Sequence, residues 1–368
     1  MQDIDMAALG HQVLWAAFAL SFVLGAIAQR THFCTMGAVA DIVNMGSWAR
    51  MRMWVLAIGV AMIGFNAMVA MGWLDAGKTI YAAPKLLWLS NIVGGFMFGF
   101  GMVMASGCGS KTLVRIGAGN LKSLLVFIVM GIAAFATLKG ITAVLRVNTV
   151  DAVSAQLSTG QDLPSLLAPA LSVQKAQLAL WIGGALGLGL IAWVLARAEG
   201  RSADVLVGGI VTGLVIAGIF WVSGVLGHVA EDPSTLEEVF VGSNSPQRMD
   251  GLSFVAPMAF ALDWLMFFSD KSKVLTIPIV SVLGVVLGSG VYAVASKAFR
   301  WEGFRTVDDM AQHLIGAVLM GVGGVVALGC TIGQGLSGVA TLSIGSFITL
   351  AAIILGAVAS LRWQLSHL

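Results

Sequence analysis

Nine apolar stretches, each long enough to cross a lipid bilayer, constrain this chain more than any other feature of its sequence. Apolar residues make up 58% of its 368 residues and charged residues only 10%, whereas an average soluble protein has about 25% charged residues. A helix that rises about 1.5 Å per residue needs about 20 apolar residues to cross the hydrocarbon. We therefore predict an all-α polytopic membrane protein in which residues 1–368 form a single integral membrane domain. The predicted spans are approximately residues 12–29, 53–74, 86–106, 122–144, 176–196, 204–224, 274–295, 309–329 and 343–364.

Four shorter stretches between these spans are semi-apolar and rich in glycine, serine and threonine. They cover residues 33–46, 109–118, 254–268 and 331–341. Each is too short to cross a bilayer as a helix and too apolar for an ordinary loop. Irregular backbone at membrane depth is tolerated only where it is buried in protein or lines a cavity. We therefore predict that these stretches are re-entrant half-helices.

A fixed offset of 222 residues relates two parts of the chain. It pairs Gly107 with Gly329 and Cys108 with Cys330, and it also pairs Gly94 with Gly316, Gly99 with Gly321, Gly101 with Gly323, Ala105 with Ala327, Met36 with Met258, Asp41 with Asp263 and Ser47 with Ser269. The two copies begin five spans apart, an odd number, so the second is inserted upside down relative to the first. We predict two inverted-topology repeats, about residues 30–145 and 252–364, joined by spans five and six. Such repeats are typical of transporters.

All three cysteines occupy equivalent places in this duplicated pattern. Cys108 and Cys330 each follow a glycine at the end of a span, and Cys34 precedes the first half-helix, at a position that pairs with Ala256. A single buried cysteine usually serves packing, but three of three at equivalent helix starts favour a common site. The N-terminus of a half-helix attracts anions through its unpaired N–H groups and its dipole. A thiol adds a soft donor, so a small anion that contains both sulfur and oxygen suits this site.

Charged residues give weaker signals. Lys111 and Arg115 could raise the local anion concentration, although they also fit ordinary topology-determining cations. Asp41 and Asp263 favour capping or pairing over proton transfer. Nothing in the sequence predicts a metal, a cofactor or a nucleic-acid partner, because the cysteines form no CxxC pair and no tetrahedral zinc pattern.

Lysine and arginine are concentrated in alternate connections between the spans. Because such residues are retained on the cytoplasmic side, we predict that the N-terminus lies outside and the C-terminus in the cytoplasm. The long loops at residues 145–175 and 229–251 would then lie outside.

Three cysteine motifs resemble those of the YeeE/YedE family of bacterial inner-membrane proteins: Arg30-x-x-Phe33-Cys34, Gly107-Cys108-x-x-Lys111-Thr112 and Gly329-Cys330-Thr331-Ile332-Gly333-x-Gly335. The resemblance implies an inverted-repeat fold with central short helices, and non-enzymatic uptake of thiosulfate or a closely related sulfur-containing anion. It also implies that the three cysteines pass the ion along by S–H···S contacts, and that a small soluble sulfur carrier of the TusA type accompanies the protein. The candidate pathway residues are Cys34, Cys108, Cys330, Gly107, Gly329 and Lys111.

Two other functions remain open from the sequence. The first is a membrane-embedded sulfurtransferase that forms a cysteine persulfide, for which only Lys111 beside Cys108 offers the cation that a thiolate nucleophile needs. The second is a passive pore for small neutral solutes, because inverted repeats with half-helices also build pores. The order in which the thiols meet an ion is likewise open.

Overall fold

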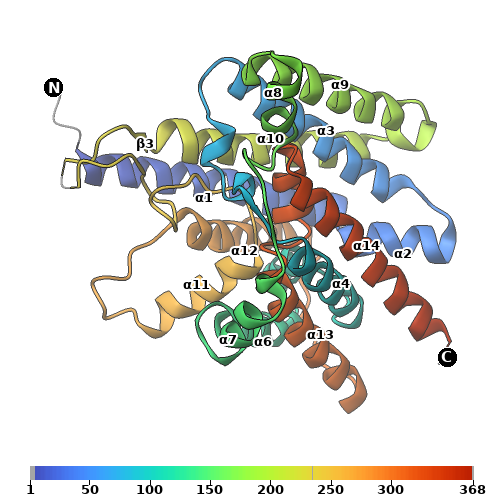
Figure 1. Ribbon diagram of the computed structural model, residues 1–368. Helices are drawn as coiled ribbons and strands as arrows, with labels where there is room; N and C mark the ends of the chain where they lie inside the picture. Colours follow the sequence, from blue (N-terminus) through green and yellow to red (C-terminus); the bar gives the residue numbers. More distant parts are fainter. Residues whose placement is uncertain (1–4, 234, 367–368) are drawn as a thin grey trace.

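The computed structural model describes residues 5–233 and 235–366, and these are folded almost entirely as helices (Figure 1). Nine helical segments of the described part of the chain are long and apolar enough to cross a membrane, and each overlaps one of the predicted spans. The prediction of an all-α polytopic membrane protein is therefore confirmed. The long helices are α1 (Met6–Thr31), α3 (Ala49–Ala70), α4 (Trp88–Met104), α6 (Leu121–Lys139), α9 (Lys175–Leu195), α10 (Ala203–Trp221), α12 (Ile277–Ala295), α13 (Val307–Val326) and α14 (Ile344–Leu365).

Local capping explains where these helices begin and end relative to the predicted spans. Helix α1 begins six residues before the predicted span because the Asp5 carboxylate accepts hydrogen bonds from the N–H groups of Ala7 and Ala8, which caps the helix in water. Helix α6 ends at Lys139 rather than near residue 144 because Gly140 interrupts it with an extended backbone. The apolar stretch continues beyond Gly140 as the separate helix α7 (Ile141–Asn148).

Short helical elements occupy all four of the predicted half-helix stretches. Three of them are α-helices: α2 (Thr35–Met45), α5 (Gly109–Gly117) and α11 (Val255–Met266). The fourth, η6 (Gly333–Gly338), is a π-helical turn, and three of its six residues are glycines, which tolerate unusual backbone but disfavour a regular helix. Whether these elements re-enter a bilayer from one face stays a prediction.

Helices α4 and α13 cross at the centre of the molecule through a reciprocal glycine contact. A Cβ atom on Gly94 would lie 2.7 Å from the carbonyl oxygen of Gly323, and a Cβ atom on Gly316 would lie 2.6 Å from that of Gly101. Only residues without a side chain allow two helix backbones to approach this closely. At the offset of 222, Gly94 corresponds to Gly316 and Gly101 to Gly323, so each of the two contacts is the counterpart of the other. A two-fold relation between the copies requires this correspondence. The reciprocal glycine contacts support the predicted inverted repeat, which stays a prediction.

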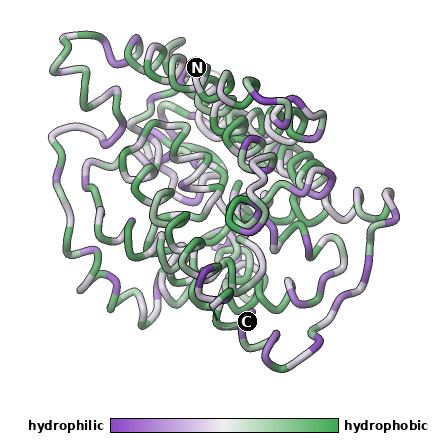
Figure 2. The backbone as a smooth tube through the Cα atoms, turned by 90° about the vertical axis from the view of Figure 1, so that its right-hand side faces the viewer, coloured by the Kyte–Doolittle hydropathy of each residue, from purple (hydrophilic) through white to green (hydrophobic). Residues whose placement is uncertain are grey.

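Around this crossing, α14 packs on α4 and α6 packs on α13, while α1 pairs with α12 and α3 lies between α9 and α10. Figure 1 shows the two ends of the chain on opposite sides of the bundle. Hydrophobic residues follow most of the helices and hydrophilic residues collect in the connections, as Figure 2 shows. Which end faces the cytoplasm stays a prediction.

The long connections gather at the end of the bundle where α1 begins. Strand β1 pairs with β2, which joins the connections before α4 and before α9, and β3 pairs with β4 within the connection before α11. An isolated bridge between Thr79 and Met249 ties the connection before α11 to the one before α4. Lys78 forms an ion pair with Glu238 between two of them, and this pairing lowers the pKa of the Glu238 carboxyl. The small elements are η1 (Ala76–Lys78), η2 (Ile80–Ala82), β1 (Lys85–Leu86), η3 (Val150–Ala152), β2 (Ala155–Gln156), α8 (Leu163–Leu171), η4 (Ala198–Arg201), η5 (Val222–Leu226), β3 (His228–Val229) and β4 (Val239–Phe240).

Candidate functional site

Each of the three thiols lies at the start of a short helical element, where the sequence predicts it. Cys34 is the N-cap of α2, and its sulfur accepts a hydrogen bond from the Gly37 N–H at 3.4 Å. Cys108 is the N-cap of α5. Cys330 stands just before η6, and its sulfur accepts a hydrogen bond from the Gly333 N–H at 3.4 Å. In α2 a sulfur atom therefore takes the place that a Ser or Asp oxygen holds in most helix caps.

The backbone reaches Cys108 and Cys330 through the same sharp turn. Ser106 and Leu328, which are related by the offset of 222, both adopt the left-handed conformation, at φ 54° and 58°. The N–H of the next residue, Gly107 or Gly329, then bonds to the carbonyl five residues earlier at 2.8 Å. This ends the long helix and turns the chain into the short one. A bulky residue such as Leu328 at positive φ is strained, and such strain is concentrated at functional sites.

The three thiols form a connected group with Cys108 in its middle. The side chains of Cys34 and Cys108 lie close enough to each other to interact. Thr331 and Cys330 also lie within interaction range of Cys108. All three thiols are free, and their exposed fractions are 7% for Cys34 and 0% for the other two. The structure thus shows a closed state in which no thiol faces open solvent.

Cations gather beside Cys34 and Cys108. Lys111 lies within electrostatic range of both thiols and of Arg50 and Arg115. The Arg115 guanidinium donates a hydrogen bond to the Ser106 carbonyl at 2.8 Å, which ties it to the turn before Cys108. This side of the thiol group is therefore the one that attracts an anion.

Arg50 is the functional candidate that the sequence alone did not single out, because it resembles an ordinary topology-determining cation. Its guanidinium covers the first turn of α2: a Cβ atom on Gly37 would lie 2.4 Å from Arg50 Nη1. Asp41 holds it there through an ion pair of 3.1 Å. The matching carboxylate, Asp263, forms an ion pair of 2.5 Å with Lys273. Both aspartates thus form ion pairs, the role that the sequence favoured over proton transfer.

Polar groups without positive charge surround Cys330. The Ser253 hydroxyl lies 3.9 Å from its sulfur. Tyr81 and Asp250, both buried, come from two of the long connections, and Tyr81 lies within electrostatic range of Cys330 and Asp250. The Tyr81 hydroxyl is buried without a hydrogen-bond partner that meets ordinary geometry in the described structure. The two ends of the thiol group therefore differ, with cations at one end and neutral hydroxyl groups beside a buried carboxyl at the other.

The two candidate glycines make room for side chains in this closed state. A Cβ atom on Gly107 would lie 3.2 Å from Lys111 Cγ, and one on Gly329 would lie 3.0 Å from Gln334 Cγ. Gln334 donates hydrogen bonds to two carbonyls at the end of α13, at 3.0 and 3.1 Å. Larger residues at either glycine would push on the side chain that lines the turn.

Comparison with known proteins places this geometry in a family. A family described as "Sulphur transport" matches residues 30–359. The chain is 27% identical over 360 residues to the thiosulfate transporter TsuA of Spirochaeta thermophila, covering 94% of this chain and 97% of the relative. It is 28% identical over 346 residues to the thiosulfate transporter TsuA of Escherichia coli, covering 91% and 90%. It is also 25% identical over 118 residues to the probable transporter YedE of Salmonella typhimurium, covering 32% of this chain and 27% of the relative.

Proposed function

Because this chain belongs to the sulphur transport family, in agreement with the YeeE/YedE resemblance of its motifs, we propose that it takes up thiosulfate across the bacterial inner membrane. Family membership assigns a transport role to a multi-pass membrane protein, not an enzymatic one. The observation that carries the substrate assignment is the connected group of three buried thiols with cations at one end. A thiosulfate ion has an outer sulfur for thiol contacts and oxygens for N–H and cationic donors.

In this proposal the three thiols act as a relay. Each cysteine donates S–H to the outer sulfur of the ion in turn, and the neighbouring thiol lies close enough to accept the ion next. Because Cys108 lies within interaction range of both Cys34 and Cys330, an ion that moves along the series in either direction passes it. Each thiol lies at the start of a short helical element, where backbone N–H groups without an intrahelical partner can stabilise the oxygens of the ion.

The membrane potential opposes this uptake. At 100 mV, negative inside, each charge costs about 2.3 kcal/mol, so a dianion faces roughly 4.6 kcal/mol. No chain of intramembrane carboxylates or histidines stands out in the sequence as a proton route, and Asp41 and Asp263 both form ion pairs with cations. We therefore assign the driving force to consumption of the ion inside, by a small soluble sulfur carrier of the TusA type. We also propose that the N-terminus lies outside and the C-terminus in the cytoplasm, as the distribution of lysine and arginine predicts.

A strain that lacks other importers tests the substrate. With this protein it should grow on thiosulfate as the only sulfur source, and proteoliposomes should take up thiosulfate in competition with unlabelled thiosulfate but not with sulfate, which has no soft sulfur. The variant in which Cys34, Cys108 and Cys330 are all alanine should lose this uptake while still inserting in the membrane. Full uptake by that variant, or equal competition by sulfate, would refute the relay.

The Asp41–Arg50 pair offers a second test. We expect Asp41→Asn to raise the KM for thiosulfate about three- to fivefold, because a partly exposed ion pair contributes up to about 1 kcal/mol to holding Arg50 beside the thiols. Asp263→Asn is the matched control, since it removes the equivalent carboxylate from Lys273. Uptake kinetics in proteoliposomes measure both. Equal KM changes in the two variants would mean that Arg50 has no special part.

A further inference from the structure

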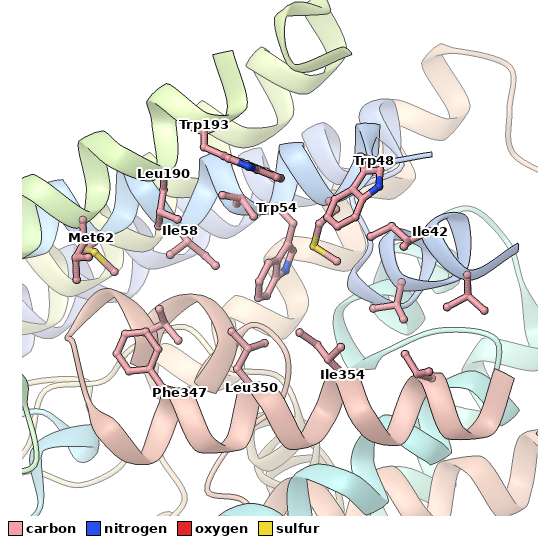
Figure 3. A pocket seen from close by; sticks show the side chains of 17 residues that line it. Ile42, Trp48, Trp54, Ile58, Met62, Leu190, Trp193, Phe347, Leu350 and Ile354 are labelled. Atoms are coloured by element: carbon pink, nitrogen blue, oxygen red, sulfur yellow. The ribbon is translucent and has the colours of Figure 1, made fainter. Parts of the chain in front are cut away.

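A long apolar groove lies between α3, α9 and α14, and none of the three cysteines lines it (Figure 3). Its volume is about 570 Å³, which is in the range of a ligand pocket. Helices α3 and α9 form one wall and α14 forms the other, where Phe347, Leu350 and Ile354 point toward Leu190 and Ile58. Every lining residue has an apolar or indole side chain. A cavity of this kind does not hold water, so an apolar occupant fits it best.

A polar cavity adjoins one end of the groove, and the two share Trp48 and Trp193. Arg52 lies at this junction with its guanidinium 4.4 Å from the centre of a Trp193 ring. Arg197 and Glu199 also line the polar cavity. Tryptophan and arginine together mark the depth of lipid headgroups in membrane proteins.

The Arg52 side chain has an unused hydrogen-bond donor at this junction. The residue is only 7% exposed, and its Nη1 donates to the carbonyl of Trp193 at 3.0 Å. Its Nε is buried with no hydrogen-bond partner; the carboxylate of Glu199 stands 3.9 Å away, too far for a hydrogen bond. A buried guanidinium donor without an acceptor is costly, so an additional acceptor is expected here.

The length of the groove matches one leaflet of a bilayer. Along α3 its lining runs from Met51 to Met62, eleven steps of about 1.5 Å or about 17 Å. Half of a hydrocarbon core of about 30 Å is about 15 Å. One acyl chain of one leaflet therefore spans the groove when its headgroup lies at the level of Trp48 and Trp193.

We propose that this groove binds a glycerophospholipid, with one acyl chain between α3, α9 and α14 and the phosphate at Arg52 and Arg197. The Glu199 carboxylate at the same end suits the ammonium of an ethanolamine headgroup. The proposal concerns a site distinct from the thiols and does not depend on which ion the protein transports.

Occupancy of the groove also supports the transport site. Ile42 and Val43 of α2 line the groove, and α2 carries Cys34 at its start. The acyl chain thus packs against the outer face of the short helix that holds the first thiol. Helix α2 contacts both α3 and α14 directly. In the proposal, the lipid adds to these contacts and holds α2 in place between the two helices.

Native mass spectrometry of the purified protein with added phosphatidylethanolamine tests the site. We expect a lipid-bound protein peak. Leu190→Trp, which fills the groove, should remove that peak, whereas Leu188→Trp should keep it, because Leu188 on the same helix is 62% exposed and does not line the groove. Arg197→Gln should lower the apparent affinity about tenfold, the effect of one charge-assisted hydrogen bond, and Arg300→Gln, an exposed cation elsewhere, should not.

Diacylglycerol, which has the acyl chains without the phosphate, is the control ligand, and it should bind at least about tenfold more weakly. Equal binding of diacylglycerol, or equal lipid binding by the Leu190 and Leu188 variants, would overturn the proposal. A lipid-free dimer that Leu190→Trp dissociates and Leu188→Trp preserves would also overturn it, because a second copy would then occupy the groove. If Leu190→Trp does not fold, Arg197→Gln still tests the proposal, because lipid affinity equal to that of the wild type would contradict it.

Discussion

Replacement of Cys108 by alanine is expected to lower thiosulfate uptake about 100-fold, more than replacement of either other cysteine. Cys108 lies within interaction range of both Cys34 and the Cys330–Thr331 segment, so its loss breaks the series in the middle. A hydrogen bond to a charged group contributes about 1.5–3 kcal/mol, and about 3 kcal/mol corresponds to about 100-fold in rate. Initial uptake rates in proteoliposomes with equal protein measure the effect.

Two further variants separate the chemistry of the thiol from its packing. Cys108→Ser keeps a small hydrogen-bond donor but replaces the soft sulfur, so it should also lose most uptake. Ser110→Ala removes only the hydroxyl that lies 3.3 Å from the Cys108 sulfur and should keep most of it. If Cys108→Ser transported at the wild-type rate, sulfur at this position would not be required and the relay would be wrong.

The sequence predicts the membrane spans well because bilayer thickness dictates their length. It also places the thiols correctly at the starts of short elements, since a run of apolar residues that ends in Gly-Cys can be recognised without tertiary information. Helix ends are predicted less accurately, as α1 and α6 show, because they depend on a single capping carboxylate and a single glycine. The π-helical form of η6 could not be predicted, because glycine allows several backbone geometries and tertiary contacts select one.

The parts of the site that the sequence misses are those that depend on distant segments. Tyr81 approaches Cys330, and Asp250 approaches Tyr81, from connections that lie far from Cys330 along the chain, and no local pattern identifies them. Arg50 is adjacent to a predicted half-helix, but its position over Gly37 appears only once the turn between α2 and α3 is folded. The pairing of Asp41 with a cation was the one signal that could have drawn attention to Arg50. The middle position of Cys108 likewise required three-dimensional contacts.

Glycines also allow α1 to pack closely on α12, which the composition alone does not predict. A Cβ atom on Gly288 would lie 1.9 Å from the Phe22 carbonyl oxygen, and one on Gly25 would lie 2.2 Å from that of Val285. The obstructing atoms belong to the backbone and cannot rotate away as a side chain can. In a bilayer, where lipid tails are as apolar as leucine, such close backbone contact is a main source of helix association.

We therefore expect Gly288→Ala to destabilise the protein by about 3 kcal/mol, the upper end of the usual cost of overpacking, because α1 must move as a whole to relieve the overlap. The thermal midpoint in detergent and the yield of folded protein measure this loss. Gly189→Ala in α9 is the matched control: nothing lies within 4 Å of its Cβ position, so the same substitution should stabilise its helix by roughly 0.5–1 kcal/mol. Opposite signs for one chemical change would show that backbone contact, not helix propensity, explains the glycine at position 288. A neutral Gly288→Ala variant would mean that α1 and α12 do not pack this closely in the membrane.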